Sequence, residues 1–313
     1  ASSHPPRACL PPVARRRPAK GSMEPAPSLP QAAQQRRVGR LAQHVLPRPG
    51  VADASPQQLS PSATIARGDY ERMHAASLQD RDAFWADVAK GIDWVKPYEH
   101  ILDDSKKPFY RWYTGGQLSV CHNAVDRHLA ARGDQAAIVY DSPVTQQVTP
   151  ISYRELHHTV SRAAGVLAKL GVQVGDRVVV YMAMIPEALF AMLACARVGA
   201  IHSVVFGGFA APELAARIDD AKPVVALACT CGVEPTRIVE YMPLLNSAID
   251  LASSKPRNVV VKQRSMCRVP LVPGRDLDWD EAVSGAAPAE CVAVDSNHPL
   301  YILYTSGSTG KPK

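Results

Sequence analysis

The sequence lacks any apolar run close to the roughly 20 residues that a membrane-spanning helix requires. Aromatic residues are also scarce, at 6% of 313 residues, and acidic and basic side chains are mixed along most of the chain. Nucleic-acid-binding proteins instead present a basic patch, often with aromatic side chains on which bases stack. We therefore expect neither a membrane span nor a nucleic-acid partner.

Cysteines are present without the spacing of a disulfide framework or a metal site. The seven positions are Cys9, Cys121, Cys195, Cys229, Cys231, Cys267 and Cys291. An odd number without framework spacing favours reduced thiols in a reducing compartment. Cys229 and Cys231 lack the two-residue spacer of a redox or zinc pair, and no second pair accompanies them. We therefore expect no metal site and treat the thiols as bystanders.

Composition is that of an ordinary globular protein, with 46% hydrophobic and 20% charged residues. The net charge of +6 is concentrated at the N-terminus, because residues 1–50 carry nine basic side chains and one acidic one. The remainder of the chain therefore has a net charge of −2, which implies no polyanionic partner.

Residues 1–66 are rich in Pro, Ala, Arg and Gln and are predicted to form a disordered basic leader. An Arg-rich segment poor in acidic residues is typical of a mitochondrial transit peptide. The alternative is a disordered tail or translated upstream sequence, since the prolines interrupt an amphipathic helix; Met23 could be an internal start. We favour the mitochondrial matrix as the location, with the cytosol as the alternative.

Residues 67–129 differ from the leader in having apolar residues at helical spacing. This spacing predicts a helix or helix pair, followed by a region with several packed aromatics. The apolar positions of the helical part are Tyr70, Met73, Phe84, Trp85, Val88 and Ile92. Asp126, Arg127 and His128 have side chains of catalytic type, but nothing nearby completes a reactive set, so we interpret them as scaffold residues.

From residue 136 onward, apolar strands alternate with helical segments. Strands are predicted at 137–140, 177–182, 201–206, 224–229 and 258–262, and helices at 152–170, 186–198, 212–219 and 237–252. Ser152 and Glu155 form a capping box, while Pro186 suits a first helical turn. This alternation predicts an α/β fold with a doubly wound, mainly parallel sheet and helices on both faces. Ligands of such sheets bind at the carboxyl ends of the strands.

A phosphate-binding loop is predicted at the end of the last strand. Residues 299–303 form a short apolar run, and Thr305, Ser306, Gly307, Ser308, Thr309, Gly310 and Lys311 follow it after Tyr304. Glycines let an anion approach the backbone, hydroxyls donate hydrogen bonds, and the lysine adds a positive charge. The glycine spacing is not that of a P-loop, and the alternative interpretation is a flexible Gly/Ser linker.

The segment Tyr304–Lys313 resembles the phosphate loop of the adenylate-forming enzymes. Residues 84–129 and 181–209 resemble shared segments of the short-chain acyl-CoA synthetases, and residues 214–223 resemble the propionyl-CoA type. The resemblance covers roughly residues 67–313. It implies a short-chain N-terminal extension at 67–129 and the first part of an AMP-binding domain at 130–313.

This resemblance implies a two-step reaction that uses ATP, Mg²⁺ and coenzyme A, with small-molecule substrates as partners. A short-chain carboxylate, propionate before acetate or butyrate, would form an acyl-adenylate and then an acyl-CoA. Residues 305–311 would hold the β- and γ-phosphates. Glu234, Pro235, Thr236 and Arg237 stand where acetyl-CoA synthetases carry an Arg-Gly-Gly-Lys contact to coenzyme A. Arg237 suits a phosphate there, whereas Glu234 does not.

Three polar residues in apolar surroundings, Glu187, Arg197 and His202, are interpreted as buried structural partners. The family's other working parts correspond to positions after Lys313, so the resemblance implies an incomplete chain with no catalytic residue and no ligase activity alone. The alternatives are an acetyl-CoA synthetase proper and a non-catalytic truncated isoform. An adenylation domain for another acid is disfavoured by the extension at 67–129.

Overall fold

The computed structural model describes residues 67–234 and 237–305. Contacts divide the chain into the units Ala1–Arg40 and Leu41–Lys313, and every described residue belongs to the second unit. The predicted leader, Pro235, Thr236 and the loop positions from Ser306 to Lys311 lie outside the described residues.

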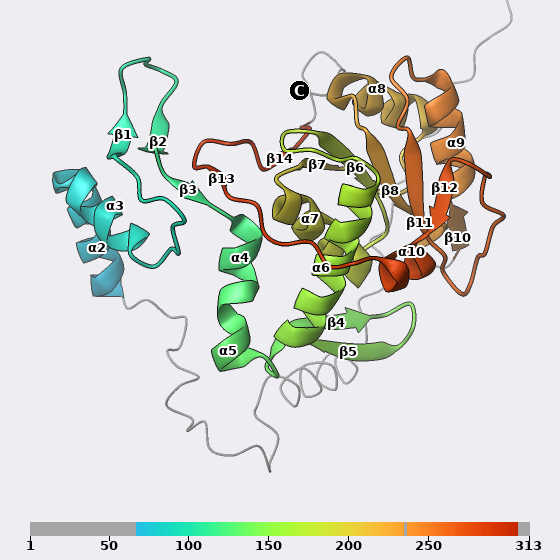
Figure 1. Ribbon diagram of the computed structural model, residues 1–313, viewed down its shortest axis with the longest axis horizontal. Helices are drawn as coiled ribbons and strands as arrows, with labels where there is room; N and C mark the ends of the chain where they lie inside the picture. Colours follow the sequence, from blue (N-terminus) through green and yellow to red (C-terminus); the bar gives the residue numbers. More distant parts are fainter. Residues whose placement is uncertain (1–66, 235–236, 306–313) are drawn as a thin grey trace, which may run out of the picture. The chain divides into compact units, whose positions relative to one another are not determined.

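The predicted parallel sheet is confirmed. Six strands follow the order β12-β11-β8-β6-β7-β14, and each neighbouring pair is parallel (Figure 1). Their bounds are β6 (Arg177–Tyr181), β7 (Ile201–Val204), β8 (Val225–Cys229), β11 (Asn258–Lys262), β12 (Asp276–Asp278) and β14 (Tyr301–Ile302). All residues of β8 are buried, as expected for a strand covered by helices on both faces.

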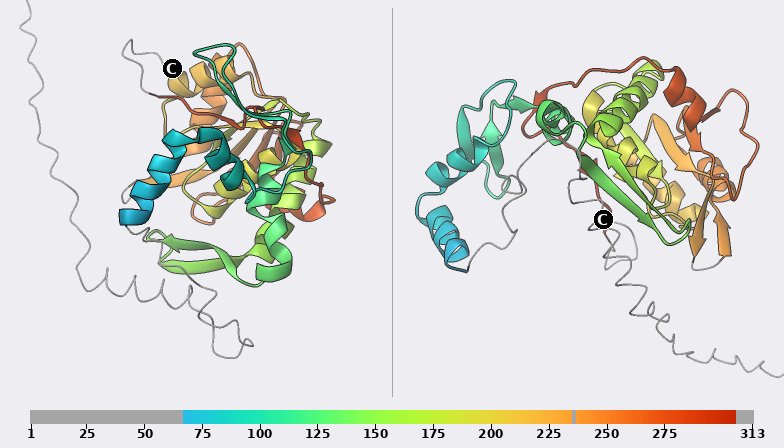
Figure 2. Two further views of the ribbon diagram at one scale, coloured as in Figure 1. Left: turned by 90° about the vertical axis from the view of Figure 1, so that its left-hand side faces the viewer. Right: turned by 90° about the horizontal axis from the view of Figure 1, so that it is seen from below.

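Helices cover the two faces of this sheet, which confirms the doubly wound fold. The bounds are α6 (Tyr153–Lys169), α7 (Pro186–Val198), α8 (Ala211–Ala221), α9 (Tyr241–Leu251) and α10 (Trp279–Gly285). Helices α6, α7 and α10 form one group, and α8 packs on α9 (Figures 1 and 2). The connection from β6 to β7 and that from β7 back to β8 run in opposite directions across the sheet, so the right-handed rule for parallel crossovers places α7 and α8 on opposite faces.

Local sequence signals explain where α6 and α7 begin and end. Ser152 caps α6 in a complete capping box with Glu155. Pro186 occupies the first turn of α7, and Gly199 ends that helix with φ 72°. A side chain at Gly199 would also meet the methyl groups of Val174 and Val294 at 3.1 Å, so two constraints select glycine here.

Residues 67–129 contain more than the predicted helix pair. Helices α2 (Arg67–Gln79) and α3 (Arg81–Ala89) confirm the helical part. The elements that follow are β1 (His100–Asp103), β2 (Arg111–Thr114), β3 (Gln117–Leu118), α4 (Val120–Ala124), the 3-10 helix η2 (Asp126–His128) and α5 (Leu129–Arg132). Strands β1 and β2 form an antiparallel hairpin. The aromatics pack together as expected, with Trp85 and Trp112 ring centroids 5.7 Å apart.

An extended segment, residues 286–298, joins parts of the fold that are far apart in the sequence. We call it the connecting segment. It contains β13 (Val294–Asp295), which pairs antiparallel with β3. Farther along, Asn297 Oδ1 accepts from the backbone N–H of Trp112 at 3.1 Å. Toward its start, the N–H of Ala289 donates to Ser161 of α6 at 2.9 Å. This segment therefore ties residues 112–118 to the helical layer of α6 and α7.

Several predicted boundaries need correction. The helix predicted at 237–252 is wrong over its first four residues, because β9 (Cys231–Glu234) and β10 (Arg237–Glu240) form an antiparallel hairpin before α9 begins. The hairpin formed by β4 (Ala136–Ser142) and β5 (Gln147–Ser152) includes the predicted strand 137–140, but β5 was not predicted. Among the described helices, none has both the length and the apolarity to cross a membrane.

Candidate functional site at the carboxyl edge of the sheet

The carboxyl ends of β7 and β14 lie side by side and define the candidate site. The two strands are parallel, with Tyr301 opposite His202 and Ile302 opposite Ser203. After β14 the chain continues to Tyr304 and Thr305, where the predicted phosphate loop begins. After β7 it continues to the Gly207-Gly208 turn. The described part of the predicted site therefore lies where ligands of parallel sheets bind.

Tyr304 attaches the root of the loop to α8. Its hydroxyl donates to Asp220 Oδ2 at 2.6 Å. Burial, together with the hydrogen bond to Asp220, raises the pKa of Tyr304 well above its usual value, so the phenol stays protonated. The guanidinium of Arg217 lies over both the Tyr304 ring, at 5.5 Å, and the Phe209 ring, at 4.7 Å. Helix α8 thus holds residues from both strand ends.

Two tyrosines shape the Gly207-Gly208 turn. Tyr181, at the end of β6, accepts from the N–H of Gly208 at 3.2 Å and donates to the carbonyl of Phe209 at 3.1 Å. Burial raises the pKa of Tyr181 to about 12, which keeps this donor protonated. A Cβ on Gly207 would collide with the Tyr241 ring. The turn therefore requires glycine because α9 packs directly against its backbone.

The two described members of the predicted coenzyme A set, Glu234 and Arg237, lie on strands β9 and β10 beside this turn. Glu234 and Arg237 are register partners across the two strands. A Glu234 carboxylate oxygen lies 3.2 Å from the position that a Cβ on Gly208 would occupy, so Glu234 faces the turn. The Arg237 side chain is exposed. A guanidinium suits a phosphate ligand, whereas a carboxylate repels one. Of the two described residues, only Arg237 could therefore bind an anionic ligand.

Two of the three polar residues interpreted as buried structural partners, Glu187 and Arg197, form ion pairs, whereas His202 forms none among the described residues. Glu187 forms an ion pair with Lys262 at 3.0 Å, and Lys262 forms a second ion pair with Asp280 at 2.7 Å. Arg197 is buried against Asp126 at 2.8 Å. His202 is 8% exposed, and burial lowers its pKa to about 4. Within the described ranges, its Nδ1 atom has no hydrogen-bond partner.

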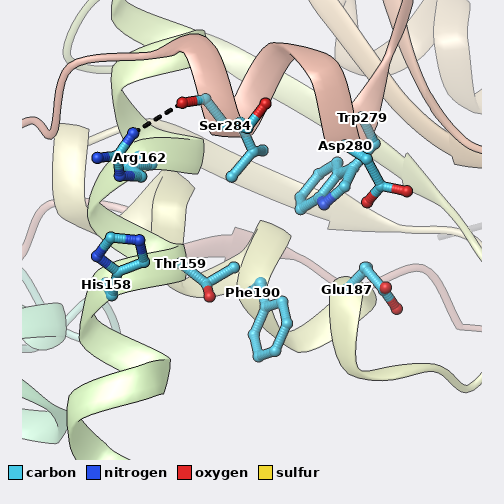
Figure 3. A pocket seen from close by; sticks show the side chains of 9 residues that line it. His158, Thr159, Arg162, Glu187, Phe190, Trp279, Asp280 and Ser284 are labelled. Carbon is cyan, nitrogen blue, oxygen red and sulfur yellow. Dashed lines mark hydrogen bonds between the residues drawn. The ribbon is translucent and has the colours of Figure 1, made fainter.

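A cavity of about 470 Å³ lies between α6, α7 and α10, with Phe190 and Trp279 among its walls (Figure 3). Arg162 spans its rim and donates to the carbonyl of Ser284 at 2.8 Å. None of the nine lining residues belongs to the predicted site. Sequence patterns did not predict this cavity, because its walls come from three separate helices.

One group of possible metal ligands is present among the described residues. The sulfurs of Cys121 and Cys291 and a carboxylate oxygen of Asp126 all lie within 4.8 Å of one another. Cys121 and Asp126 are distant in sequence from the predicted loop, and the group brings together two thiols that we had treated as bystanders.

Comparison with known proteins places these features in context. The family model for the AMP-binding enzymes matches residues 125–313, and that for the acetyl-coenzyme A synthetase N-terminus matches residues 70–124. The chain is 51% identical over 248 residues to the rat protein named "Acyl-CoA synthetase short-chain family member 3, mitochondrial", which covers 79% of this chain and 36% of the relative. It is 43% identical over 248 residues to "Propionate--CoA ligase" of Escherichia coli, with 78% and 39% covered.

A solved structure, the acetoacetyl-CoA synthetase from Streptomyces lividans, is also similar. It aligns with a TM-score of 0.72 and 29% sequence identity, and the alignment covers 79% of this chain and 38% of that one. The chain therefore spans somewhat more than a third of the length of the curated relatives described above.

Proposed function

The chain belongs to the family of AMP-binding enzymes, and from this premise we propose that the protein carrying it is an AMP-forming carboxylate–CoA ligase for short-chain acids. The names of the similar rat and Escherichia coli proteins support this activity class. One structural observation supports it most directly. Residues 304–305, where the predicted phosphate loop begins, lie beside the Gly207-Gly208 turn at the carboxyl edge of a parallel sheet.

The proposed reaction has two steps. A carboxylate oxygen attacks the α-phosphorus of ATP, which forms an acyl-adenylate and releases pyrophosphate. The thiol of coenzyme A then attacks the acyl carbon, loses its proton and displaces AMP. Mg²⁺, when bound, would offset negative charge on the phosphates.

The loop from Thr305 to Lys311 is the proposed site for the β- and γ-phosphates. Its glycines allow backbone N–H groups to approach the leaving pyrophosphate, and Lys311 supplies a positive charge. The hydrogen bond from Tyr304 to Asp220 and the stacking of Arg217 fix the point from which this loop leaves the sheet. Arg237 is the proposed contact for a phosphate of coenzyme A, and the carboxylate of its register partner Glu234 faces Gly208.

Propionate is the proposed preferred acid, with acetate as the alternative. The relative named for propionate supports this choice, as does the resemblance of residues 214–223 to the propionyl-CoA type. For location we propose the mitochondrial matrix. The rat relative carries "mitochondrial" in its name, and residues 1–50 are basic and poor in acidic side chains.

The test is AMP formation by the protein that carries this chain, with ATP, coenzyme A and either propionate or acetate. We expect turnover with both acids and a higher kcat/KM for propionate. A kcat/KM several-fold in favour of acetate would refute the substrate assignment, and absence of AMP with short-chain acids would refute the activity. Lys311→Ala should reduce kcat/KM for ATP about 10-fold or more, whereas the control Lys313→Ala should change it little.

A further inference from the structure

Two thiols that are far apart in the sequence lie in one polar cluster. Cys121 lies on α4 and is fully buried, while Cys291 lies on the connecting segment and is half-buried. Their sulfurs and an oxygen of Asp126 lie within 4.8 Å of one another. The Cys291 thiol also donates to Asp126 Oδ2 at 3.8 Å. None of these residues belongs to the candidate site at the edge of the sheet.

Arg197 makes this cluster unsuitable for a metal cation. Its guanidinium is 1% exposed and donates to both oxygens of Asp126, at 2.9 and 2.8 Å. The same Nη1 atom lies 3.6 Å from the sulfur of Cys121. A cation bound by the two sulfurs and the carboxylate would therefore face a fixed positive charge at hydrogen-bond distance. The same charge favours a thiolate.

The two thiols are not chemically equivalent. A hydrogen bond from Cys121 lowers the pKa of Cys291, and Ser119 and Arg197 add to this effect. The hydrogen bond to Cys291, together with burial, raises the pKa of Cys121. Cys291 is also the thiol that solvent can reach. Reactivity of a cysteine depends on thiolate character and access, so Cys291 is the first nucleophile of the pair.

We propose that Cys121 and Cys291 form a dithiol site that a small disulfide of the glutathione class oxidises to an intramolecular disulfide. The Cys291 thiolate attacks one sulfur of the small disulfide and expels one thiolate, which gives a mixed disulfide at Cys291. Cys121 then loses its proton, attacks the Cys291 sulfur and expels the second small thiolate. Two protein thiols are oxidised, one small disulfide is reduced to two thiols, and the balance is complete.

The positions of the two cysteines permit this closure. A disulfide needs an S–S distance of about 2.05 Å, so the sulfurs must approach by no more than about 2.8 Å from their present separation. Cys291 lies in an extended segment, outside any helix or strand, and its sulfur is already directed at the Asp126 side of the cluster. The bond would link α4 to the connecting segment and close a loop between positions 121 and 291.

A second thiol pair provides an internal comparison. The Cys231 thiol hydrogen-bonds that of Cys267, and one member of this pair is likewise buried. Burial raises the pKa of Cys231, the buried member of this pair, as it does that of Cys121. The backbone N–H of Cys267 is held by the carbonyl of Arg264 at 3.0 Å. We therefore expect the pair of Cys121 and Cys291 to oxidise at a lower ratio of oxidised to reduced glutathione than the pair of Cys231 and Cys267.

The experiment equilibrates the 313-residue chain with oxidised and reduced glutathione at varied ratios. Free thiols are then alkylated, and the crosslinked peptides are identified without reduction. We expect a 121–291 crosslink that forms before any 231–267 crosslink and that dithiothreitol reverses. The control Cys267→Ser should retain it, whereas Cys291→Ser should lose it without gaining a glutathione adduct at Cys121.

A thermal readout separates a structural crosslink from incidental oxidation. Closing so long a loop should raise the Tm of the Cys267→Ser chain by at least about 3 °C, and Cys291→Ser should show no such change. A glutathione adduct that persists at Cys291 without the crosslink would overturn the proposal. So would formation of the 231–267 crosslink first, or an oxidised chain with unchanged Tm.

Discussion

Replacing Arg197 with methionine should destabilise the fold more than any surface substitution. Arg197 is 1% exposed and donates to both oxygens of Asp126, and its Nε atom donates to the carbonyl of Ala289 at 2.6 Å. Methionine matches the unbranched part of the arginine side chain as far as Nε but has no donor. The change would leave the Asp126 carboxylate, whose side chain is 16% exposed, beside an apolar side chain.

The expected cost follows from the state of the remaining carboxylate. Removing one partner of a buried ion pair typically costs about 3–5 kcal/mol, because the other charge stays desolvated. His157 Nε2, 3.4 Å from Asp126, offsets part of this cost only when the imidazole is protonated. With a urea m-value of about 3 kcal/mol/M, the midpoint should fall by about 1–1.7 M.

Urea unfolding followed by tryptophan fluorescence measures this change. Asp126→Asn and the double variant complete a mutant cycle, and we expect the double variant to lose less than the sum of the two single losses. Arg154→Met is the matched control, because the side chains of Arg154 and Asp134 are 64% and 87% exposed and an exposed ion pair contributes little to stability. A midpoint shift below about 0.3 M for Arg197→Met, equivalent to about 1 kcal/mol, would refute the reasoning.

Three other predictions follow from the site and its supports. Burial lowers the pKa of His202 to about 4, below the unfolded value of about 6.5, so its contribution to stability is complete above pH 6.5 and lost as the pH falls toward 4. Between pH 6.5 and pH 4, the unfolding free energy of His202→Asn should therefore fall by up to about 3 kcal/mol less than that of the wild type. Urea titrations in which both proteins show the same dependence on pH would contradict this. Tyr304→Phe removes the donor to Asp220 and should raise the KM for ATP several-fold in the protein that carries this chain, while Tyr301→Phe, on the preceding strand β14, should not. Ser152→Ala removes the capping box of α6 and should cost about 1 kcal/mol in urea unfolding; an unchanged midpoint would argue against this role.

The parallel sheet and the ends of its helices could be predicted because their signals are local. The capping box of Ser152 and Glu155, Pro186 at the start of α7, and Gly199 at its end all lie within a few residues of the structure they determine. The β9–β10 hairpin was missed for the opposite reason. Strand β10 continues without a break into α9, so the sequence pattern of 237–252 does not show that the structure changes at residue 241.

The candidate site was predictable only in part. The composition of residues 305–311 pointed to phosphate binding, and the structure describes Thr305 at the end of β14. The anchoring of Tyr304 by Asp220 and Arg217 could not be predicted, because α8 reaches this edge only through the crossover that follows β7. A partial signal was available: Asp220 and Arg217 lie three positions apart and so share one side of a helix.

The connecting segment also constrains the order in which the chain folds. Its contacts join Trp112 to Asn297 and Gly116 to Ser296, pairs separated by about 180 positions. Contacts between such distant positions form late, because the intervening chain must first be ordered. During synthesis from the N-terminus, residues 112–118 must therefore wait until the strands from β6 to β12 have emerged and the connecting segment follows them. Until then the edge of β3 lacks its partner and is open to non-native pairing.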